Sequence, residues 1–523
     1  MTTKELTVLD RTYEILRAHG LTTIFGNPGS NELPFLASLP DDFSYVLGLQ
    51  EAVVTGMAEG YSRATGQPAL VSLHAASGTG NAMGALTNAV YAHVPLVLLA
   101  GQQVRRTVGQ EVMLANVDAG MLTKPLVKWA GEPLAAEDVP RAMSQAILEA
   151  ITQRGPTYLS VPWDDWAHMA LESDALLPSR RVKVCGALSR EDKDELLQRI
   201  ANWKRPVLVL GPDADGAQKS SVQLAERLGA AVWIAPSAPR CPYPTTHAHY
   251  RGLLPPGVES VRSRLEDYDG ILIIGAPLMR YHRWEPAAYT NGQDVVHITQ
   301  DNSEATRAPY GDSYVANVHQ AIAALAADVP DRGERLERRS TPPAATSEKG
   351  MTGEQVLAVL DKHVGDSITY VNEATTLDVT FLERMRVSRE NQYHFPASGG
   401  LGFGLPCAVG LALGRPDWTV VGVIGDGSAN YALPALYAAR THNTRTIFVI
   451  VNNASYGALR KFAVALQAES SPGLDIPGID FVSLAKGYGV PASTVSTPEE
   501  LDKAYTDALE AQGPVLIDAR VVQ

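Results

Sequence analysis

Two short polar segments, each directly after an apolar run, carry the most specific chemistry in this sequence. Asp426, with a glycine on either side, follows the run 419–424, and the pair Asn452 and Asn453 follows the run 446–451. Buried parallel strands read as continuous apolar runs, and ligands of open α/β sheets bind beyond the carboxyl ends of the strands. A carboxylate after one strand and an amide oxygen after the next are ligands that Mg²⁺ prefers, and Mg²⁺ commonly brings phosphates with it. The flanking glycines allow a sharp turn and a close approach of the backbone to a ligand.

The composition is that of an ordinary globular enzyme. The chain has 523 residues, of which 45% are hydrophobic and 19% charged. That length is too great for one core and predicts about three domains. The 44 basic and 57 acidic residues give a net charge of −13. This balance argues against a general affinity for nucleic acid or for anionic membranes.

The cysteine spacing and the N-terminal residues argue against a zinc protein, a disulfide-rich protein and a secreted protein. Cys185, Cys241 and Cys407 lie far apart and form no CxxC pair, so the sequence offers neither a zinc site nor a disulfide framework. The first residues enter an amphipathic pattern with no signal-peptide core, and no apolar run reaches transmembrane length. The default expectation is a cytoplasmic protein without a membrane partner.

The elements that must position these residues fall into three α/β blocks. Apolar strands alternate with helical patterns over residues 1–185, 186–330 and 351–523. Residues 331–350 are charged and then rich in Thr, Pro and Ala, which predicts a mobile linker. Alternation of this kind predicts a doubly wound parallel sheet in each block.

Two glycine-rich segments resemble dinucleotide-binding fingerprints only superficially. In the segment 78–84 the third glycine stands one position late and no suitable acidic residue follows. The segment 399–404 does not follow a buried strand. Turn geometry, or close approach of the backbone to a cofactor, explains both segments better than a nicotinamide site.

The GDG segment with its downstream Asn pair is the thiamin diphosphate (ThDP) motif, and here it is complete. Over essentially its whole length the chain resembles the benzoylformate decarboxylases of the ThDP-dependent 2-keto acid decarboxylase superfamily. Ser30, His74 and His282, occurring together, point to this family within the superfamily. The resemblance implies pyrimidine-binding, central and diphosphate-binding domains in that order. The segments that carry it, besides GDG and the Asn pair, are 25–34, 49–52, 73–74, 280–282 and 456–460.

The resemblance also implies residues that hold the cofactor. Asp426, Asn453 and the backbone carbonyl of Ser455 would bind the Mg²⁺ that anchors the diphosphate. Leu401 would force the bent conformation of ThDP, and the carbonyl of Gly399 would accept from its 4′-amino group. The full set of implied cofactor contacts is Asn27, Thr375, Thr376, Gly399, Leu401, Gly425, Gly427, Ser428 and Tyr456.

Glu51 is the candidate for cofactor activation. It stands between Leu49 and Ala52 in an apolar setting, where a carboxylate is costly unless paired. Desolvation favours its neutral form, which can share a proton. Taken alone, a Glu here reads as an ordinary residue at a helix N-terminus. The resemblance implies that Glu51 shares a proton with the pyrimidine N1′ of ThDP.

Three further residues are implied in catalysis. Ser30, in a Pro-Gly turn, would donate a hydrogen bond to the substrate. It could also cap the N-terminus of the following helix, because the two roles are compatible. His74 and His282 would transfer protons before and after CO₂ leaves, since the histidine pKa lies near working pH. Each histidine taken alone reads as a hydrogen-bonded structural residue. His19, His93 and His394 lack such a context and are expected to be structural.

The residues implied for the substrate pocket are mostly apolar, and aromatic side chains suit an aryl group. Core packing is their alternative role. Met113 stands where the family suggests Leu, Ser398 where it suggests Ala, and Lys461 where it suggests Trp. These departures concern the identity of the substrate and not the cofactor. The implied pocket residues are Met113, Leu114, Phe395, Ala458, Leu459 and Phe462.

The function implied is non-oxidative decarboxylation of an aromatic 2-keto acid, benzoylformate to benzaldehyde and CO₂, through a ThDP ylide and an enamine. Because the same enamine can attack an added aldehyde, carboligation is an expected side activity. The resemblance also implies a homotetramer, a dimer of dimers, in which Glu51 and Asp426 of different subunits meet at the dimer interface.

Three alternatives stay open at this point. Two are enzymes of the same superfamily, an acetolactate-synthase-like ligase and a pyruvate-oxidase-like flavoenzyme. The central block has no convincing dinucleotide fingerprint near Gly211 or Gly275, which disfavours the flavoenzyme. The third, a non-catalytic ThDP-binding scaffold, would be favoured by loss of Glu51 or Asp426, and both are present.

Overall fold

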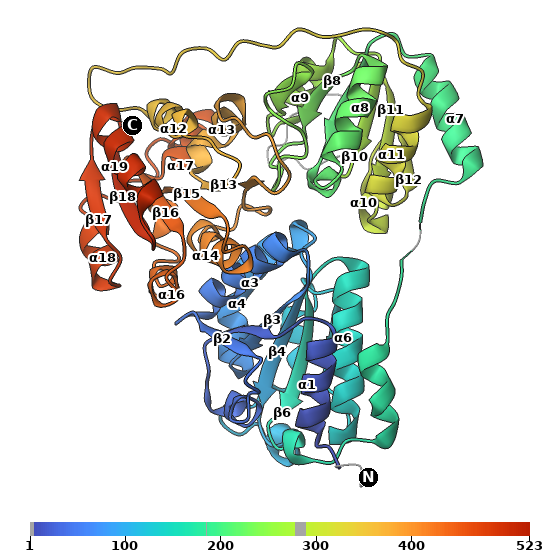
Figure 1. The fold of residues 1–523 in the computed structure, drawn as a ribbon, viewed down its shortest axis with the longest axis vertical. Coiled ribbons are helices and arrows are strands. Elements are labelled where there is room, and N and C mark those ends of the chain that lie inside the picture. The colour runs from blue at the N-terminus through green and yellow to red at the C-terminus, as the bar shows by residue number, and fades with distance from the viewer. Residues whose placement is uncertain (1–4, 185, 278–288, 523) are drawn as a thin grey trace.

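Three six-stranded parallel sheets, one in each third of the chain, form the frame of the molecule (Figure 1). The computed structural model describes residues 5–184, 186–277 and 289–522. Helices flank each sheet, as expected where parallel strands must be covered on both faces. The predicted fold class, three doubly wound α/β units, is confirmed. The domain boundaries drawn from the sequence stay predictions.

The N-terminal sheet has the strand order β2-β1-β3-β4-β6-β5. Its first helix begins with a capping box between Thr7 and Asp10 and ends just before Gly20, whose φ of 75° suits glycine. The strands are β1 (Thr23–Gly26), β2 (Ser44–Leu47), β3 (Ala69–Leu73), β4 (Leu96–Gln102), β5 (Trp129–Gly131) and β6 (Thr157–Pro162). The helices are α1 (Val8–Ala18), α2 (Leu33–Leu36), α3 (Glu51–Thr65), α4 (Ala75–Tyr91), α5 (Ala119–Thr123) and α6 (Val139–Gln153).

The central sheet has the order β12-β11-β10-β7-β8-β9. Its strands are β7 (Pro206–Leu210), β8 (Ala231–Ile234), β9 (Tyr250–Leu253), β10 (Gly270–Ile274), β11 (Asp294–Thr299) and β12 (Asp312–Val315). Its helices are α7 (Arg190–Ala201), α8 (Gln218–Leu228), α9 (Val258–Leu265), α10 (Asn302–Arg307) and α11 (Val318–Asp328).

The C-terminal sheet has the order β14-β13-β15-β16-β18-β17 and carries the Asp426 and Asn453 segments. Its strands are β13 (Ile368–Glu373), β14 (Tyr393–His394), β15 (Thr419–Gly425), β16 (Thr446–Asn452), β17 (Ala492–Val495) and β18 (Val515–Arg520). Its helices are α12 (Gly353–Lys362), α13 (Asp378–Arg384), α14 (Gly404–Gly414), α15 (Asp426–Ala429), α16 (Ala435–Thr441), α17 (Gly457–Ala465), α18 (Phe481–Gly487) and α19 (Pro498–Glu510).

Helices α3 and α14 join the N-terminal and C-terminal units at backbone contact. A Cβ on Gly410 of α14 would lie 1.9 Å from the carbonyl oxygen of Met57, and one on Gly60 of α3 would lie 2.3 Å from that of Cys407. Only glycine permits helices to approach this closely. The unit that holds Glu51 and the unit that holds Asp426 therefore pack through one fixed helix pair.

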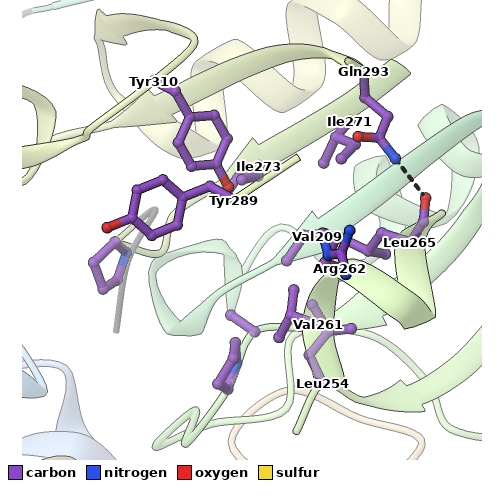
Figure 2. Close-up of a pocket in the computed structure, with 13 residues that line it drawn as sticks. Val209, Leu254, Val261, Arg262, Leu265, Ile271, Ile273, Tyr289, Gln293 and Tyr310 are labelled. Atoms are coloured by element: carbon purple, nitrogen blue, oxygen red, sulfur yellow. Dashed lines mark hydrogen bonds between the residues drawn. The ribbon is translucent and has the colours of Figure 1, made fainter. Parts of the chain in front are cut away.

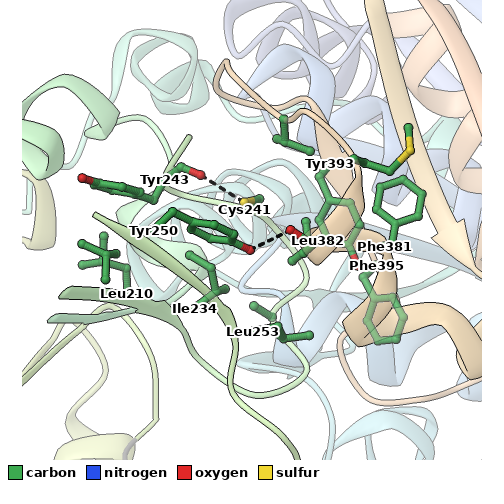
Figure 3. Packing of buried hydrophobic residues seen from close by; sticks show 14 of the residues in the cluster. Leu210, Ile234, Cys241, Tyr243, Tyr250, Leu253, Phe381, Leu382, Tyr393 and Phe395 are labelled. Atoms are coloured by element: carbon green, nitrogen blue, oxygen red, sulfur yellow. Dashed lines mark hydrogen bonds between the residues drawn. The ribbon is translucent and has the colours of Figure 1, made fainter. Parts of the chain in front are cut away.

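The central unit packs on the C-terminal unit through a shared apolar core (Figure 3). Tyr250 of β9 lies in one cluster with Phe381, Tyr393 and Phe395, and its hydroxyl donates to the carbonyl of Leu382 at 3.0 Å. This core sets the position of the segment leading to Phe395, a predicted pocket residue.

The segment 331–349 contains no helix or strand and crosses between the central and C-terminal units (Figure 1). Arg332 donates to the carbonyls of Trp203 and Ile200, and Arg384 donates to those of Pro342 and Pro343. The segment is thus held along both units by side-chain hydrogen bonds. Across the described ranges, no helix combines the length and the apolar character needed to cross a membrane.

Candidate active site

A large cavity of about 1420 Å³ opens beyond the carboxyl ends of β13, β15 and β16. This is where parallel sheets place ligands. The structure brings all of the predicted cofactor, metal and pocket residues of the C-terminal unit into its wall. Those residues are Thr375, Thr376, Phe395, Gly399, Leu401, Gly425, Asp426, Gly427, Ser428, Asn453, Ser455, Tyr456, Ala458, Leu459 and Phe462.

Asp426 presents a carboxylate oxygen that has no hydrogen-bond partner in the described part of the chain. It directly follows β15 and is 3% exposed. Its Oδ1 accepts from the N–H of Gly427 at 2.9 Å, whereas Oδ2 is buried and accepts no hydrogen bond from the described residues. Burial raises the pKa of this carboxyl group, against the neighbouring backbone N–H groups that lower it. A buried carboxylate oxygen of this kind calls for a cation.

The two asparagines after β16 have different surroundings. Asn452 points into the sheet, where its Nδ2 donates to Asp518 at 2.8 Å. Asn453 lines the cavity, and its Oδ1 accepts from the N–H of Ser455 at 3.1 Å. Arg460 donates to the hydroxyl of Ser455 at 2.8 Å, and this hydrogen bond holds the turn 453–455 in place. The arrangement offers a carboxylate, an amide and a carbonyl at one end of the sheet.

The described part of the chain contains no group of three or more His, Cys, Asp or Glu side chains suited to a metal. A site built from one carboxylate, an amide and a carbonyl is not a group of that kind. Its oxygen ligands suit a hard cation that keeps phosphate or water ligands of its own.

A glycine-rich loop forms another part of the cavity wall. Gly399 and Gly402 have φ of 76° and 93°, the left-handed region that favours glycine. Ser398 donates its hydroxyl to Asn88 Oδ1 at 2.7 Å and shares a hydrogen bond with Thr87 at 2.8 Å. The Ser398 departure from the family pattern therefore adds contacts to α4.

The predicted residues of the N-terminal unit form a second group. Glu51, the first residue of α3, is 6% exposed. Asn27 donates to its Oε1 at 3.2 Å and Asn81 donates to its Oε2 at 3.0 Å. Both carboxylate oxygens are thus held by side-chain amides in a fixed orientation.

His74 lies at the start of α4 with its ring anchored on one side. Its Nδ1 lies 2.9 Å from Oε2 of Glu32, a buried residue that also accepts from the N–H groups of Gly29 and Gly101. With Nδ1 engaged, Nε2 is the ring nitrogen that forms no hydrogen bond with the described residues. Ser30 lies beside this pair, its hydroxyl 3.4 Å from Oδ1 of Asn31.

Met113 and Leu114 lie beside the same group. Asn31 donates to the carbonyl of Leu114 at 3.5 Å. Met113 is 84% exposed within the single chain. The predicted residues of the N-terminal unit do not line the large cavity. His282 lies outside the described residues.

A second cavity lies in the central unit beside β10 (Figure 2). The described residues around it enclose about 30 Å³, which is room for about one water molecule. The rings of Tyr289 and Tyr310 stack at 5.5 Å along one side.

Comparison with protein families covers all three units. Models of the thiamine pyrophosphate enzymes match at residues 6–121 for the N-terminal TPP binding domain, 194–325 for the central domain and 374–519 for the C-terminal TPP binding domain. The chain belongs to the thiamine pyrophosphate enzymes. Thiamine pyrophosphate is ThDP, so the family predicted from the GDG segment and the Asn pair is confirmed.

Several proteins resemble this thiamine pyrophosphate enzyme along its full length. It is 50% identical to benzoylformate decarboxylase of Pseudomonas aeruginosa over 98% of both chains. A solved ThDP-dependent 4-hydroxybenzoylformate decarboxylase of Rhodococcus jostii is also 50% identical, with a TM-score of 0.97 over 99% of both chains. Benzoylformate decarboxylase of Polynucleobacter necessarius is 35% identical, with a TM-score of 0.96 over 99% of both chains.

Reasoning from the sequence missed three residues that this thiamine pyrophosphate enzyme places beside the predicted ones. They are Glu32, which holds His74, Asn81, which holds Glu51, and Glu373, which holds the glycine-rich loop. Glu32 lies inside the family segment 25–34, and Glu373 ends an apolar strand where a carboxylate is costly. Those two features could have singled them out, whereas nothing in the sequence distinguishes Asn81.

Proposed function

We propose that this protein is a decarboxylase of an aromatic 2-keto acid that uses ThDP and Mg²⁺, with benzoylformate or a ring-substituted benzoylformate as substrate. The observation that carries the proposal is the Asp426 site, whose Oδ2 accepts no hydrogen bond within the described ranges, in a cavity lined by Phe395 and Phe462. The full-length relatives named for benzoylformate and 4-hydroxybenzoylformate support the substrate class. Carboligation to a 2-hydroxyketone is the side activity we expect.

The C-terminal unit would hold the cofactor. Asp426 Oδ2, the side chain of Asn453 and the carbonyl of Ser455 would bind Mg²⁺, and the hydroxyls of Thr375 and Thr376 would donate to the diphosphate. When bound, ThDP supplies an electron sink for the pair released as CO₂ leaves. Ser428 stands next to the Thr pair, with its hydroxyl on the carbonyl of Glu373 at 3.2 Å.

The remaining cofactor contacts shape the cavity wall. A Cβ on Gly427 would lie 2.6 Å from the ring of Tyr456, so glycine lets that ring close over the turn. Asn27, Gly399, Leu401 and Gly425 complete the proposed contacts. Leu401 would fill the space beneath the bound cofactor.

Residues of the N-terminal unit would carry out the proton transfers. Glu51, with both oxygens held by amides, would share a proton with the pyrimidine nitrogen of ThDP. His74 Nε2, with Nδ1 fixed by Glu32, would pass a proton to and from the substrate oxygen. Ser30 would donate to the substrate carboxylate. His282 remains a prediction for the proton that replaces CO₂.

The substrate's ring would lie on apolar side chains from both units. Phe395, Ala458, Leu459 and Phe462 line the cavity and offer aromatic and small surfaces for an aryl group. Met113 and Leu114 would close it from the other unit. Lys461 also lines the cavity and donates to the carbonyl of Thr376 at 3.3 Å, so a ring substituent with a polar or negative group is compatible with this wall.

The two groups of residues would meet between two copies of the chain. Each is incomplete alone, and each exposes apolar side chains: Met113 is 84%, Leu459 51% and Phe462 37% exposed. Exposed apolar side chains grouped beside a functional site often belong to an interaction surface. We propose an isologous dimer that joins Glu51 of one copy to Asp426 of the other, a tetramer built from two such dimers, and a cytoplasmic location.

The test is a coupled assay of the apoprotein reconstituted with ThDP and Mg²⁺. Benzoylformate, 4-hydroxybenzoylformate, pyruvate and a branched 2-keto acid are compared by reduction of the product aldehyde with added alcohol dehydrogenase. Turnover of an aryl substrate that needs both cofactors, with pyruvate far slower, supports the proposal. Aldehyde from none of the four contradicts it, and a yellow protein with flavin absorbance would favour the flavoenzyme alternative.

A further inference from the structure

Glu373, at the end of β13, has a fully buried carboxylate that accepts hydrogen bonds from the backbone of one loop. Its Oε1 accepts from the N–H groups of Gly402 and Phe403 at 2.8 and 2.9 Å, and its Oε2 accepts from that of Gly404 at 2.8 Å. Burial raises the pKa of Glu373 to about 7, against these three donors that lower it. A buried carboxylate is costly to keep, and here all of its described side-chain hydrogen bonds go to successive residues of a single backbone segment.

That segment carries two of the proposed cofactor contacts. Gly399 and Leu401 both line the large cavity, and Leu401 lies one residue before Gly402. The loop contains two residues in the left-handed region, Gly399 and Gly402. Glycine-rich backbone loses much conformational freedom on ordering, so such a loop needs hydrogen bonds to keep one shape.

The neighbourhood of Glu373 is shaped to admit these bonds. A Cβ on Gly404 would lie 2.9 Å from Glu373 Oε2 and 2.2 Å from the side chain of Ile424. Glycine is therefore required for this N–H to approach the carboxylate. The carbonyl of Glu373 accepts from the hydroxyl of Ser428, and the chain continues through Ala374 to Thr375 in the cavity wall. One residue thus connects the glycine-rich loop with the wall on the diphosphate side.

The other end of the loop is fixed independently by α4. Asn88 donates to the carbonyl of Gly400 at 2.9 Å and accepts from the N–H of Ser398 at 3.1 Å. The loop is therefore held at 398–400 by the N-terminal unit and at 402–404 by Glu373. Leu401 is the residue between the two sets of bonds.

We propose that Glu373 is a positioning residue that preorganises the loop 399–404, so that Leu401 and the Gly399 carbonyl stand ready for ThDP before the cofactor binds. This inference rests on the proposed function, because it assumes that ThDP occupies the large cavity. In this proposal, Glu373 raises the affinity for ThDP by ordering the loop backbone, without contacting the cofactor itself.

The test combines hydrogen exchange and cofactor binding, neither of which needs substrate. In the wild-type apoprotein, the amides of residues 402–404 are expected to exchange slowly, because the carboxylate already holds them. In Glu373→Gln the side-chain amide places an N–H against a backbone donor, so exchange in this peptide should accelerate. A partner lost from a buried polar site should weaken ThDP binding by about tenfold or more, which is about 1.4 kcal/mol.

Glu304→Gln is the matched control. Glu304 is also buried, burial also raises its pKa, and its side chain accepts from Thr299 in the central unit at 2.9 Å. It should leave ThDP affinity within about threefold of wild type even if the protein melts at a lower temperature. A loss of affinity in Glu373→Gln that the control does not share separates positioning from a general loss of stability.

Two results would overturn the inference. One is fast exchange of residues 402–404 in the wild-type apoprotein, which can be read even if Glu373→Gln fails to fold. The other is wild-type ThDP affinity in Glu373→Gln. A wild-type protein that binds no ThDP at all would instead contradict the proposed function, so the two failures are distinguishable.

Discussion

Asn81 of α4 donates its side-chain amide to Oε2 of Glu51 at 3.0 Å, so the carboxylate at the start of α3 is oriented by the next helix. A second amide, from Asn27, holds Oε1 at 3.2 Å. The two bonds leave Glu51 with a fixed direction and little freedom to turn. That is the geometry a residue needs if it is to share one proton with one ligand atom.

Glu51→Gln is expected to lower kcat by about 100-fold or more while ThDP still binds, because general acid–base groups contribute about 10²–10⁴-fold. The isosteric amide keeps the shape but cannot share the proton. Stopped assays for kcat and a titration of ThDP by intrinsic fluorescence check the two halves of this statement. Unchanged kcat in the variant would remove Glu51 from the mechanism.

Asp426→Asn is expected to abolish Mg²⁺-dependent binding of ThDP. The buried Oδ2 has no hydrogen-bond partner among the described residues, and replacing it by an amide removes the charge that a divalent cation requires. The measurement is a ThDP titration with and without Mg²⁺. The control is Asp417→Asn, the same change at an exposed ion pair with Arg415. Normal metal-dependent binding in Asp426→Asn would show that the cation lies elsewhere.

Mixing the two inactive variants tests whether the site is shared between chains. If Glu51 and Asp426 come from different copies, each mixed dimer of Glu51→Gln with Asp426→Asn has one intact site. An equal mixture refolded together should then recover about a quarter of wild-type activity, because half of the dimers are mixed and half of their sites are intact. No recovery, although mass spectrometry detects mixed dimers, would mean that each chain builds its own site.

His93 is expected to make stability depend on pH. It is nearly buried between the N-terminal and central units, with Nδ1 3.0 Å from Asp213 and Nε2 3.6 Å from Glu304 and 3.7 Å from Asp301. Arg154 also binds Asp213, at 2.6 Å. Burial lowers the pKa of His93, but the carboxylate of Asp213 outweighs burial and the pKa is raised above 6.5.

Because the folded state raises this pKa, the stabilisation is fully present below the unfolded value of 6.5 and is lost as pH rises through the folded value. His93→Gln should therefore melt lower than wild type by a margin that is larger at pH 6 than at pH 9, with a stability difference of about 1.5–3 kcal/mol on the acid side. His168→Gln, at an exposed histidine, corrects for loss of an imidazole from the surface. A margin independent of pH would contradict the account.

The sequence predicted the sheet and the ligands at its edge because both are local patterns. The runs 419–424 and 446–451 became β15 and β16 with their ends displaced by one residue, and Asp426 and Asn453 follow them into the cavity wall. Such strands are buried on both faces, so their sequences are continuous apolar runs that are easy to recognise.

The supporting contacts could not be predicted, since they join residues far apart in the chain. Glu32 and His74 are separated by 42 positions, and Glu373 binds amides about 30 positions ahead of it. The hydrophobic periodicity of a sequence carries no information about such long-range pairs. Met113 was predicted for the pocket but lies exposed in the single chain, so its role stays a prediction that depends on a second copy.

The most direct test of the central claim is the proton nuclear magnetic resonance spectrum of the product formed from benzoylformate in D₂O by the enzyme reconstituted with ThDP and Mg²⁺. A non-oxidative decarboxylase must replace CO₂ by a proton from an exchangeable group, so the account predicts benzaldehyde that carries deuterium at the formyl carbon. Benzoate as the product would indicate oxidation, and a 2-hydroxyketone as the only product would indicate a ligase. Failure to consume both benzoylformate and 4-hydroxybenzoylformate under these conditions would contradict the account.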